Sequence, residues 1–197
     1  MTEPEFLELS SKFERINKAY VNFIALNNRL LELGIGQTDL ANDLKEIMDQ
    51  FKKIQTVAST QMKQLNIDNE EFEQGNIGLA QFAKRLSIST SKVADVTFDL
   101  DMEVSPRLLR LSKKLAVPVI EGAKSVQDEN PVIAEEAKNL EIKMGEVSRE
   151  ADAVDRIDKT LSLVDRAIVL GKKVYSIAVE HAPKILPKLA PLAALFV

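Results

Sequence analysis

The sequence predicts an all-α protein, an elongated antiparallel helical bundle with heptad-patterned long helices and a very long last helix. Three observations carry this prediction. Apolar residues recur at alternating spacings of three and four over most of the chain, as in helices that pack against other helices. Gly and Pro number only seven each in 197 residues, so few positions interrupt these stripes. The stretches between the stripes are short, which favours neighbouring antiparallel helices.

The first helix is expected over about residues 2–33. Thr2 and Glu5 have the spacing of a capping box at its start. Its apolar stripe is interrupted at Asn27, which either fixes the register of packing or is a polar residue tolerated near a helix end. The glycine-containing turn that begins at Gly34 ends this helix.

The second helix is expected over about residues 39–66, followed by a separate acidic turn in which Asp68 and Glu71 form another capping box. The third is expected over about residues 77–104. Within it, Val96–Val104 alternates strictly between apolar and polar residues, which is a strand pattern. A helix is favoured because the same residues continue a helical stripe and a single strand has no partner.

The fourth helix is expected over about residues 106–127, with Ser105 as its cap and Pro106 at its first position. Pro118 lies inside this helix. Because proline lacks a backbone N–H and its ring crowds the preceding turn, a kink is expected near Lys114.

The last helix is expected to be single over residues 130–182, with Asn130 as its cap and Pro131 at its first position. Its apolar seam slips by three residues after Val154, which in a continuous helix is a local overwinding. At about 1.5 Å per residue it would be roughly 75–80 Å long. Shorter helices must then stack end to end along it. Otherwise the face from Ile157 to Ala178 needs a second copy, and the sequence favours this self-association.

The C-terminal tail, residues 183–197, differs in kind from the rest of the chain. Prolines recur every fourth residue with apolar residues between them. From Gly171 onward the chain has four lysines and one glutamate, whereas the whole chain has a net charge of −4. The prolines and two of the lysines rule out an ordinary transmembrane helix. Two interpretations remain: the tail covers the end of the bundle, or it docks on a membrane surface or in a partner's groove.

The docking interpretation predicts a set of contact residues. Apolar side chains would enter the partner or the membrane interface, and lysines would attract anionic head groups. Docking is expected to be shallow because the prolines forbid a regular deep helix. On this interpretation, deleting the tail removes binding to anionic vesicles and leaves stability unchanged. The predicted contact residues are Lys172, Lys173, Lys184, Ile185, Leu186, Lys188, Leu189, Leu192, Leu195 and Phe196.

The sequence contains no pattern that indicates an enzyme. The absence of Cys excludes disulfides and thiolate metal sites. The single histidine, His181, excludes a two-histidine metal site and the di-iron chemistry of ferritin-like bundles. The stretch Gly171–Lys173 lacks the other residues of a phosphate-binding loop. The carboxylates between Asp99 and Glu103 diverge if they lie on a helix. We therefore predict no catalytic residue, cofactor or metal ligand.

The predicted function is that of a non-enzymatic interaction protein whose long last helix and apolar, basic tail engage a protein partner or a second copy. The alternative is a membrane-active protein, of the α-helical pore-forming or membrane-binding type, that inserts its tail. The acidic net charge gives no reason to expect nucleic acid as a partner. The acidic N-terminus lacks the apolar stretch of a standard signal peptide. A cytoplasmic location, with or without peripheral attachment to a membrane, is therefore expected.

Overall fold

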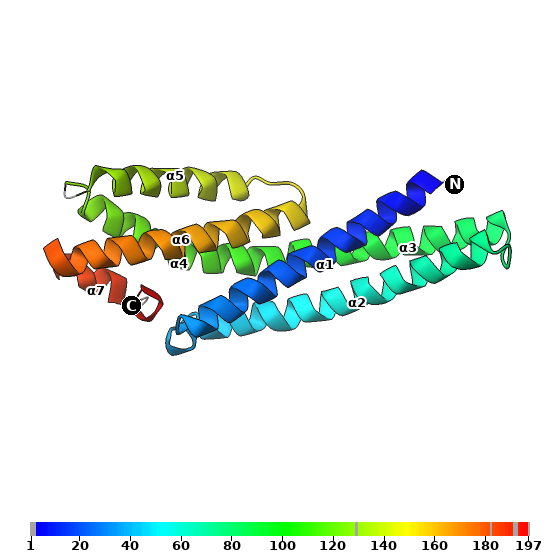
Figure 1. The fold of residues 1–197 in the computed structure, drawn as a ribbon, viewed down its shortest axis with the longest axis horizontal. Helices are drawn as coiled ribbons and strands as arrows, with labels where there is room; N and C mark the ends of the chain where they lie inside the picture. Colours follow the sequence, from blue (N-terminus) through cyan, green and yellow to red (C-terminus); the bar gives the residue numbers. More distant parts are fainter. Residues whose placement is uncertain (1–2, 129, 182, 191–192, 197) are drawn as a thin grey trace.

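The computed structural model describes residues 3–128, 130–181, 183–190 and 193–196. The chain is helical through most of these residues and contains no strand among them, which confirms the all-α prediction. Figure 1 shows two overlapping groups of helices. One group consists of α1 (Glu3–Glu32), α2 (Ala41–Glu73) and α3 (Leu79–Asp99), and the other of α4 (Ser105–Ser125), α5 (Pro131–Val147) and α6 (Ala153–His181).

α1 and α2 form a hairpin through a short 3-10 turn, η1 (Ile35–Gln37). Gly34 precedes this turn with a φ of 87°, a left-handed conformation that glycine adopts without a steric penalty. The Thr38 hydroxyl then donates to the Ile35 carbonyl at 2.7 Å and accepts from the Leu40 N–H at 3.2 Å. The predicted end of the first helix at Gly34 is thereby confirmed.

α2 continues to Glu73, and the separate acidic turn predicted after residue 66 is wrong. Asp68 lies inside α2 and is only 3% exposed. Its carboxylate accepts a hydrogen bond from Arg85 of α3 at 2.7 Å, and the same guanidinium pairs with Glu71. The two carboxylates that resemble a helix cap in the sequence are therefore held by a residue of the next helix.

The longest helical run of the described chain is formed by α3, η2 (Leu100–Val104) and α4, and not by the last helix. Its segments of 21, 5 and 21 residues span roughly 70 Å at about 1.5 Å per residue. The predicted break at Pro106 is wrong. η2 is a π-helical turn in which the Ser105 N–H donates to the Leu100 carbonyl, five residues back. This wider turn accommodates a proline that cannot donate to an ordinary helical hydrogen bond.

The segment with alternating apolar and polar residues is helical, as the sequence favours. Val96, Leu100 and Val104 are buried at spacings of four, whereas Phe98 and Met102 are 63% and 55% exposed. A strand would place all five side chains on one face. The observed burial is instead that of one side of a helix.

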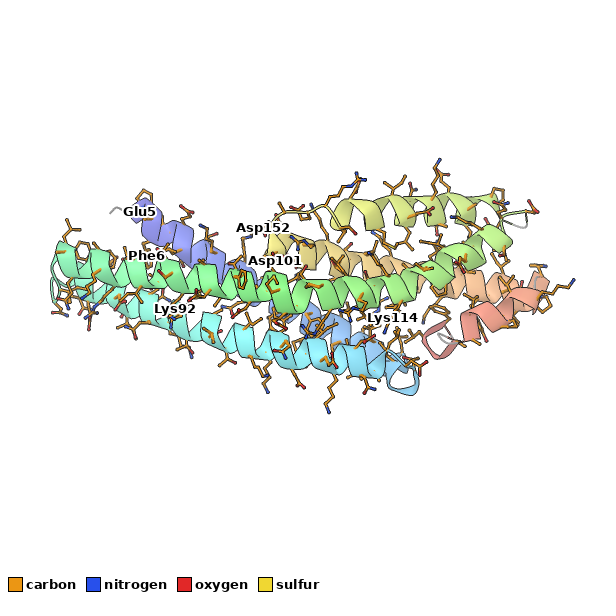
Figure 2. All side chains as sticks on the ribbon, turned by 180° about the vertical axis from the view of Figure 1, so that it is seen from behind. Glu5, Phe6, Lys92, Asp101, Lys114 and Asp152 are labelled. Carbon is orange, nitrogen blue, oxygen red and sulfur yellow. The ribbon has the colours of Figure 1, made fainter. Side chains whose placement is uncertain are left out.

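α4 continues through Pro118, which lies inside it. Figure 2 shows α4 turning toward α5 beyond the labelled Lys114, in agreement with the predicted kink. Lys114 is four residues before the proline, so its carbonyl is the one that loses a hydrogen-bond donor. Its side chain pairs with Asp43 of α2.

The single last helix predicted over residues 130–182 is wrong. The chain forms two helices, α5 and α6, which pack against each other and are joined by a turn at residues 148–152. The start of α5 agrees with the prediction, because the Asn130 side chain accepts a hydrogen bond from the Val132 N–H at 3.2 Å. The slip of the apolar seam near Val154 is therefore a reversal of the chain and not an overwound helix.

Arg156 and Asp152 hold the turn between α5 and α6. The Arg156 guanidinium donates to the Glu150 carbonyl at 2.7 Å and to the Ala151 carbonyl at 3.1 Å. The Asp152 carboxylate accepts from the Asp155 N–H at 2.9 Å, which is the geometry of a helix cap. The turn contains neither Gly nor Pro, which is why the heptad pattern alone does not reveal it.

Because the chain reverses between α5 and α6, the face of α6 that was expected to need a second copy is covered within the same chain. α6 packs against α1, α4 and α5 and against the C-terminal residues. Ile157, Val164 and Ala178, on the face in question, are each 0% exposed. The predicted need for a second copy along this face is therefore removed.

α6 runs in the same direction as α1 and α4, so the bundle is not simply antiparallel (Figure 1). Three polar pairs join α1 to α6 and advance together along both helices. They are Arg15–Asp155 at 2.7 Å, Asn22–Asp158 at 3.2 Å and Arg29–Asp165 at 2.6 Å. Antiparallel packing is found between helices that a turn joins.

Candidate interaction site

The C-terminal segment, defined here as residues 183–196, folds back over the end of α6. It consists of η3 (Pro183–Ile185), α7 (Leu186–Leu189) and α8 (Ala193–Phe196). All three elements contact α6, while α7 also contacts α4 and α8 also contacts η1. Figure 1 shows the segment beside the turn between α1 and α2. The structure therefore agrees with the interpretation in which the tail covers the end of the bundle.

The apolar side chains that the sequence assigns to docking point into the protein. We call four of them the anchor residues: Ile185, Leu189, Leu195 and Phe196, which are 8%, 0%, 0% and 6% exposed. Leu186 is half-buried against the same core, and Leu192 lies outside the described residues. Contact of the anchor residues with a partner or a membrane therefore requires that the segment leave its position.

The lysines predicted to accompany these side chains are not gathered with them. Lys172 and Lys184 are exposed and form no ion pair with any described residue. Lys173 pairs with both carboxylate oxygens of Glu136 on α5, at 2.7 and 2.9 Å. Lys188 belongs to α7, and its side chain lies outside the described part of the structure. The structure thus places apolar side chains inward and the free lysines outward.

Phe196 lies directly on α6 because Gly171 has no side chain. A Cβ at Gly171 would lie 2.5 Å from Cζ of the Phe196 ring, closer than real Cβ contacts. The ring centroid of Phe196 is also 6.5 Å from that of Tyr175, one helical turn further along α6. Glycine at this position therefore allows an aromatic ring to rest on the helix backbone.

Gly122 of α4 is likewise approached by Leu189 of α7, though less closely. A Cβ at Gly122 would lie 3.0 Å from Cγ1 of Val174 and 3.2 Å from Cδ2 of Leu189. Leu189 therefore packs where α4 and α6 come together. We refer to Gly122, Gly171 and Val174 as the segment-binding surface.

The C-terminal segment is attached by apolar contacts alone within the described residues. No described side chain between Pro183 and Phe196 forms a hydrogen bond or an ion pair with the rest of the protein. Elsewhere in the described chain, no buried side-chain nitrogen or oxygen lacks a partner. The helices are thus joined by polar as well as apolar contacts, whereas the segment is held by apolar contacts only.

Sequence reasoning does not identify the two glycines as part of this site. Gly171 stands at a position of the apolar seam that would ordinarily carry a larger side chain, and Gly122 lies inside a predicted helix. Glycine inside a helix costs about 1 kcal/mol relative to alanine. Its presence at a packed position is a signal of close approach by another part of the chain. What approaches cannot be inferred from the sequence pattern.

A cavity of about 380 Å³ lies between α1, α5 and α6. Two ion pairs line it, Arg29–Asp165 at 2.6 Å and Lys173–Glu136 at 2.7 Å, so most of its charges are balanced within the protein. Arg166 also lines it and forms no ion pair with a described residue. Most of the charged groups that could orient a small-molecule ligand in the cavity are therefore already paired with one another.

The chain matches no protein-family model, no curated protein and no solved structure. In the part of the chain that the structure describes, no helix is both long and apolar enough to cross a membrane. The same residues contain no group of three or more His, Asp and Glu side chains that could hold a metal ion.

Proposed function

We propose that the chain is a non-enzymatic interaction protein, an elongated helical bundle that binds another protein through the end of α6 and the C-terminal segment. One observation carries the proposal. The segment is attached through four buried apolar side chains and, among the described residues, through no hydrogen bond or ion pair. Apolar contacts are non-directional, and their release leaves no buried polar group without a partner. The segment is therefore suited to detach as a unit and to be replaced.

The rest of the molecule supports a binding role and not a catalytic one. The charged cavity between α1, α5 and α6 is largely balanced by its own ion pairs, and no buried side-chain nitrogen or oxygen of the described residues lacks a hydrogen-bond partner. Among the described residues there is thus no buried polar atom without a partner and no residue other than glycine with a positive φ, two features that often accompany a reactive site.

A membrane-binding role is the second candidate, because of the free lysines. Lys172 of α6 and Lys184 of η3 are exposed and form no ion pair with a described residue. If the segment detached, its anchor residues would be exposed beside these charges. That combination binds anionic lipid surfaces through apolar burial and electrostatic attraction.

The experiment uses the full-length chain with two anchors made polar, Leu189→Ser together with Phe196→Ser, called the released variant. A fluorescently labelled peptide of residues 183–197 is titrated against it, and anisotropy is measured. We expect saturable binding to the released variant and at least tenfold weaker binding to the wild type, whose surface is occupied. The matched control adds Gly171→Leu to the released variant, and its peptide binding should be lost.

Flotation with anionic vesicles distinguishes the second candidate. A wild-type chain that floats with such vesicles and a released variant that does not would favour membrane binding. If the released variant keeps its helical circular dichroism spectrum but does not bind the peptide, the proposal of a replaceable segment is wrong.

A further inference from the structure

The C-terminal segment and its binding surface are complementary over two points of contact. Leu189 and Val174 both lie against Gly122, and Phe196, seven residues after Leu189, lies against Gly171. Any segment that replaces this one must offer a leucine-sized side chain at the first point. At the second it must offer a ring that fits over a bare helix backbone. The segment of an identical chain meets both requirements without any change.

We propose that the segment-binding surface also accepts the C-terminal segment of a second copy, so that two chains exchange segments reciprocally. The inference rests on the proposed function, since it names the partner that the segment engages. Exchange of an identical element keeps every contact of the closed chain and is a low-cost route to a dimer. Because the described residues of the segment are attached by apolar contacts only, none of their hydrogen bonds to the rest of the protein has to be broken and remade.

The connection between α6 and the segment is compatible with both arrangements. α6 ends at His181, and η3 begins with Pro183, two residues further along the chain. Proline has no N–H, so Pro183 donates no backbone hydrogen bond to α6 whether the segment folds back or leaves. Apart from this connection, the anchor residues and the half-buried Leu186 attach the described part of the segment to the protein.

Concentration decides which arrangement forms. A segment joined by a short connection experiences an effective concentration of its own surface on the order of millimolar. The closed monomer therefore prevails in dilute solution, and exchange between wild-type chains requires concentrations approaching that value. A chain whose own segment cannot bind presents a surface without this competition. Variants can thus reveal the exchange at low concentration.

The test combines two full-length variants that are defective in complementary ways. In the first, Gly171→Leu blocks the surface and leaves the segment intact. The second is the released variant, with an open surface and a segment that cannot anchor. We expect each to be monomeric alone at micromolar concentration and the mixture to form a 1:1 heterodimer, measured by light scattering. Its dissociation constant should be at least tenfold lower than that of wild-type self-association.

Two controls make the outcome decisive. The variant that carries all three substitutions should not associate with the released variant, because it has neither an anchoring segment nor an open surface to offer. If Gly171→Leu loses its helical spectrum, Gly122→Leu blocks the other contact point and takes its place. A mixture that stays monomeric while both variants remain helical overturns the exchange. If the labelled peptide still binds the released variant in that case, the proposed function stands and only the second copy is excluded as its partner.

Discussion

The ring of Phe196 occupies the space above Gly171 that the Cβ of any other residue would fill. The two residues lie 25 positions apart, one inside α6 and the other in α8. Their contact couples the conformation of the C-terminal segment to a position where a helix would ordinarily gain from a side chain. The sign of the change in the free energy of unfolding on replacing Gly171 with alanine therefore reports whether the segment is in place.

We expect Gly171→Ala to loosen the C-terminal segment. The added Cβ would overlap the Phe196 ring, which offsets the gain of about 1 kcal/mol that alanine brings to a helix. Hydrogen exchange of residues 183–197 should become at least tenfold faster, as measured by mass spectrometry. The matched control is Gly145→Ala in α5, where a Cβ meets nothing within 4 Å. That substitution should raise the free energy of unfolding by up to about 1 kcal/mol and leave the segment unchanged.

Phe196→Ala is expected to lower the melting temperature, in contrast to the unchanged stability expected from the sequence. Phe196 is 6% exposed, and truncation of a buried phenylalanine costs roughly 3–5 kcal/mol where the site stays ordered. The loss should be smaller than that for Phe23→Ala in the core, because the segment can detach and so limit the cost. Phe98→Ala is the exposed control, at 63% exposure, and should change the free energy of unfolding by less than about 0.5 kcal/mol. Equal melting temperatures for Phe196→Ala and Phe98→Ala would contradict the packing described.

Replacement of Arg156 should lower the free energy of unfolding by more than replacement of Arg29. Arg156 is 16% exposed and donates to the Asp101 carboxylate at 2.5 Å and to the Glu150 carbonyl at 2.7 Å, joining η2 to the turn before α6. Hydrogen bonds to charged groups contribute about 1.5–3 kcal/mol, so Arg156→Met should lower stability by at least about 2 kcal/mol. Arg29 is 46% exposed in its pair with Asp165, and Arg29→Met should cost less than about 1 kcal/mol. Urea unfolding measures the loss of stability in each of the two variants. Losses of similar size would contradict this prediction.

The turn between α5 and α6 should become less stable in acid. A hydrogen bond from Lys159, followed by one from the Asp152 backbone, lowers the pKa of Glu150 below its ordinary value of 4.5. A carboxylate with a lowered pKa stabilises the fold above its ordinary pKa, and this contribution is lost as the pH falls through the lowered value. Glu150→Gln should therefore reduce the dependence of stability on pH below about 4.5. Lys159→Met removes the largest cause of the shift and should have the same effect. If NMR titration gives Glu150 its ordinary pKa, this interpretation fails.

Local signals in the sequence are sufficient for some of these features and insufficient for others. The cap at Asn130 and the turn at Gly34 depend on neighbouring residues, and both are predicted correctly. The turn held by Arg156 depends on a side chain that also reaches Asp101, which is distant in sequence, and heptad spacing does not record it. Asp68 resembles a cap in the sequence and is bonded by Arg85 of the next helix.

The candidate site shows the same division. The anchor residues are recognisable as apolar side chains in a segment rich in proline, so the sequence identifies them as contact residues. Their destination depends on Gly122 and Gly171, which accept them only when α4, α6 and the segment are brought together. Spacing along one helix carries no information about a surface formed by two.

The π-helical turn η2 adds one residue to the longest helix of the described chain. On both sides of it, buried residues alternate at spacings of four and three, but Val96, Leu100, Val104 and Leu108 follow one another at four. In an ordinary α-helix, such a run would rotate the buried stripe away from its partners. The wider turn of η2 absorbs the surplus residue, so that α3 and α4 keep a common inner side. A single residue among Leu100–Val104 thus sets the phase between the two ends of the molecule, and its removal would turn α4 by about 100° relative to α3.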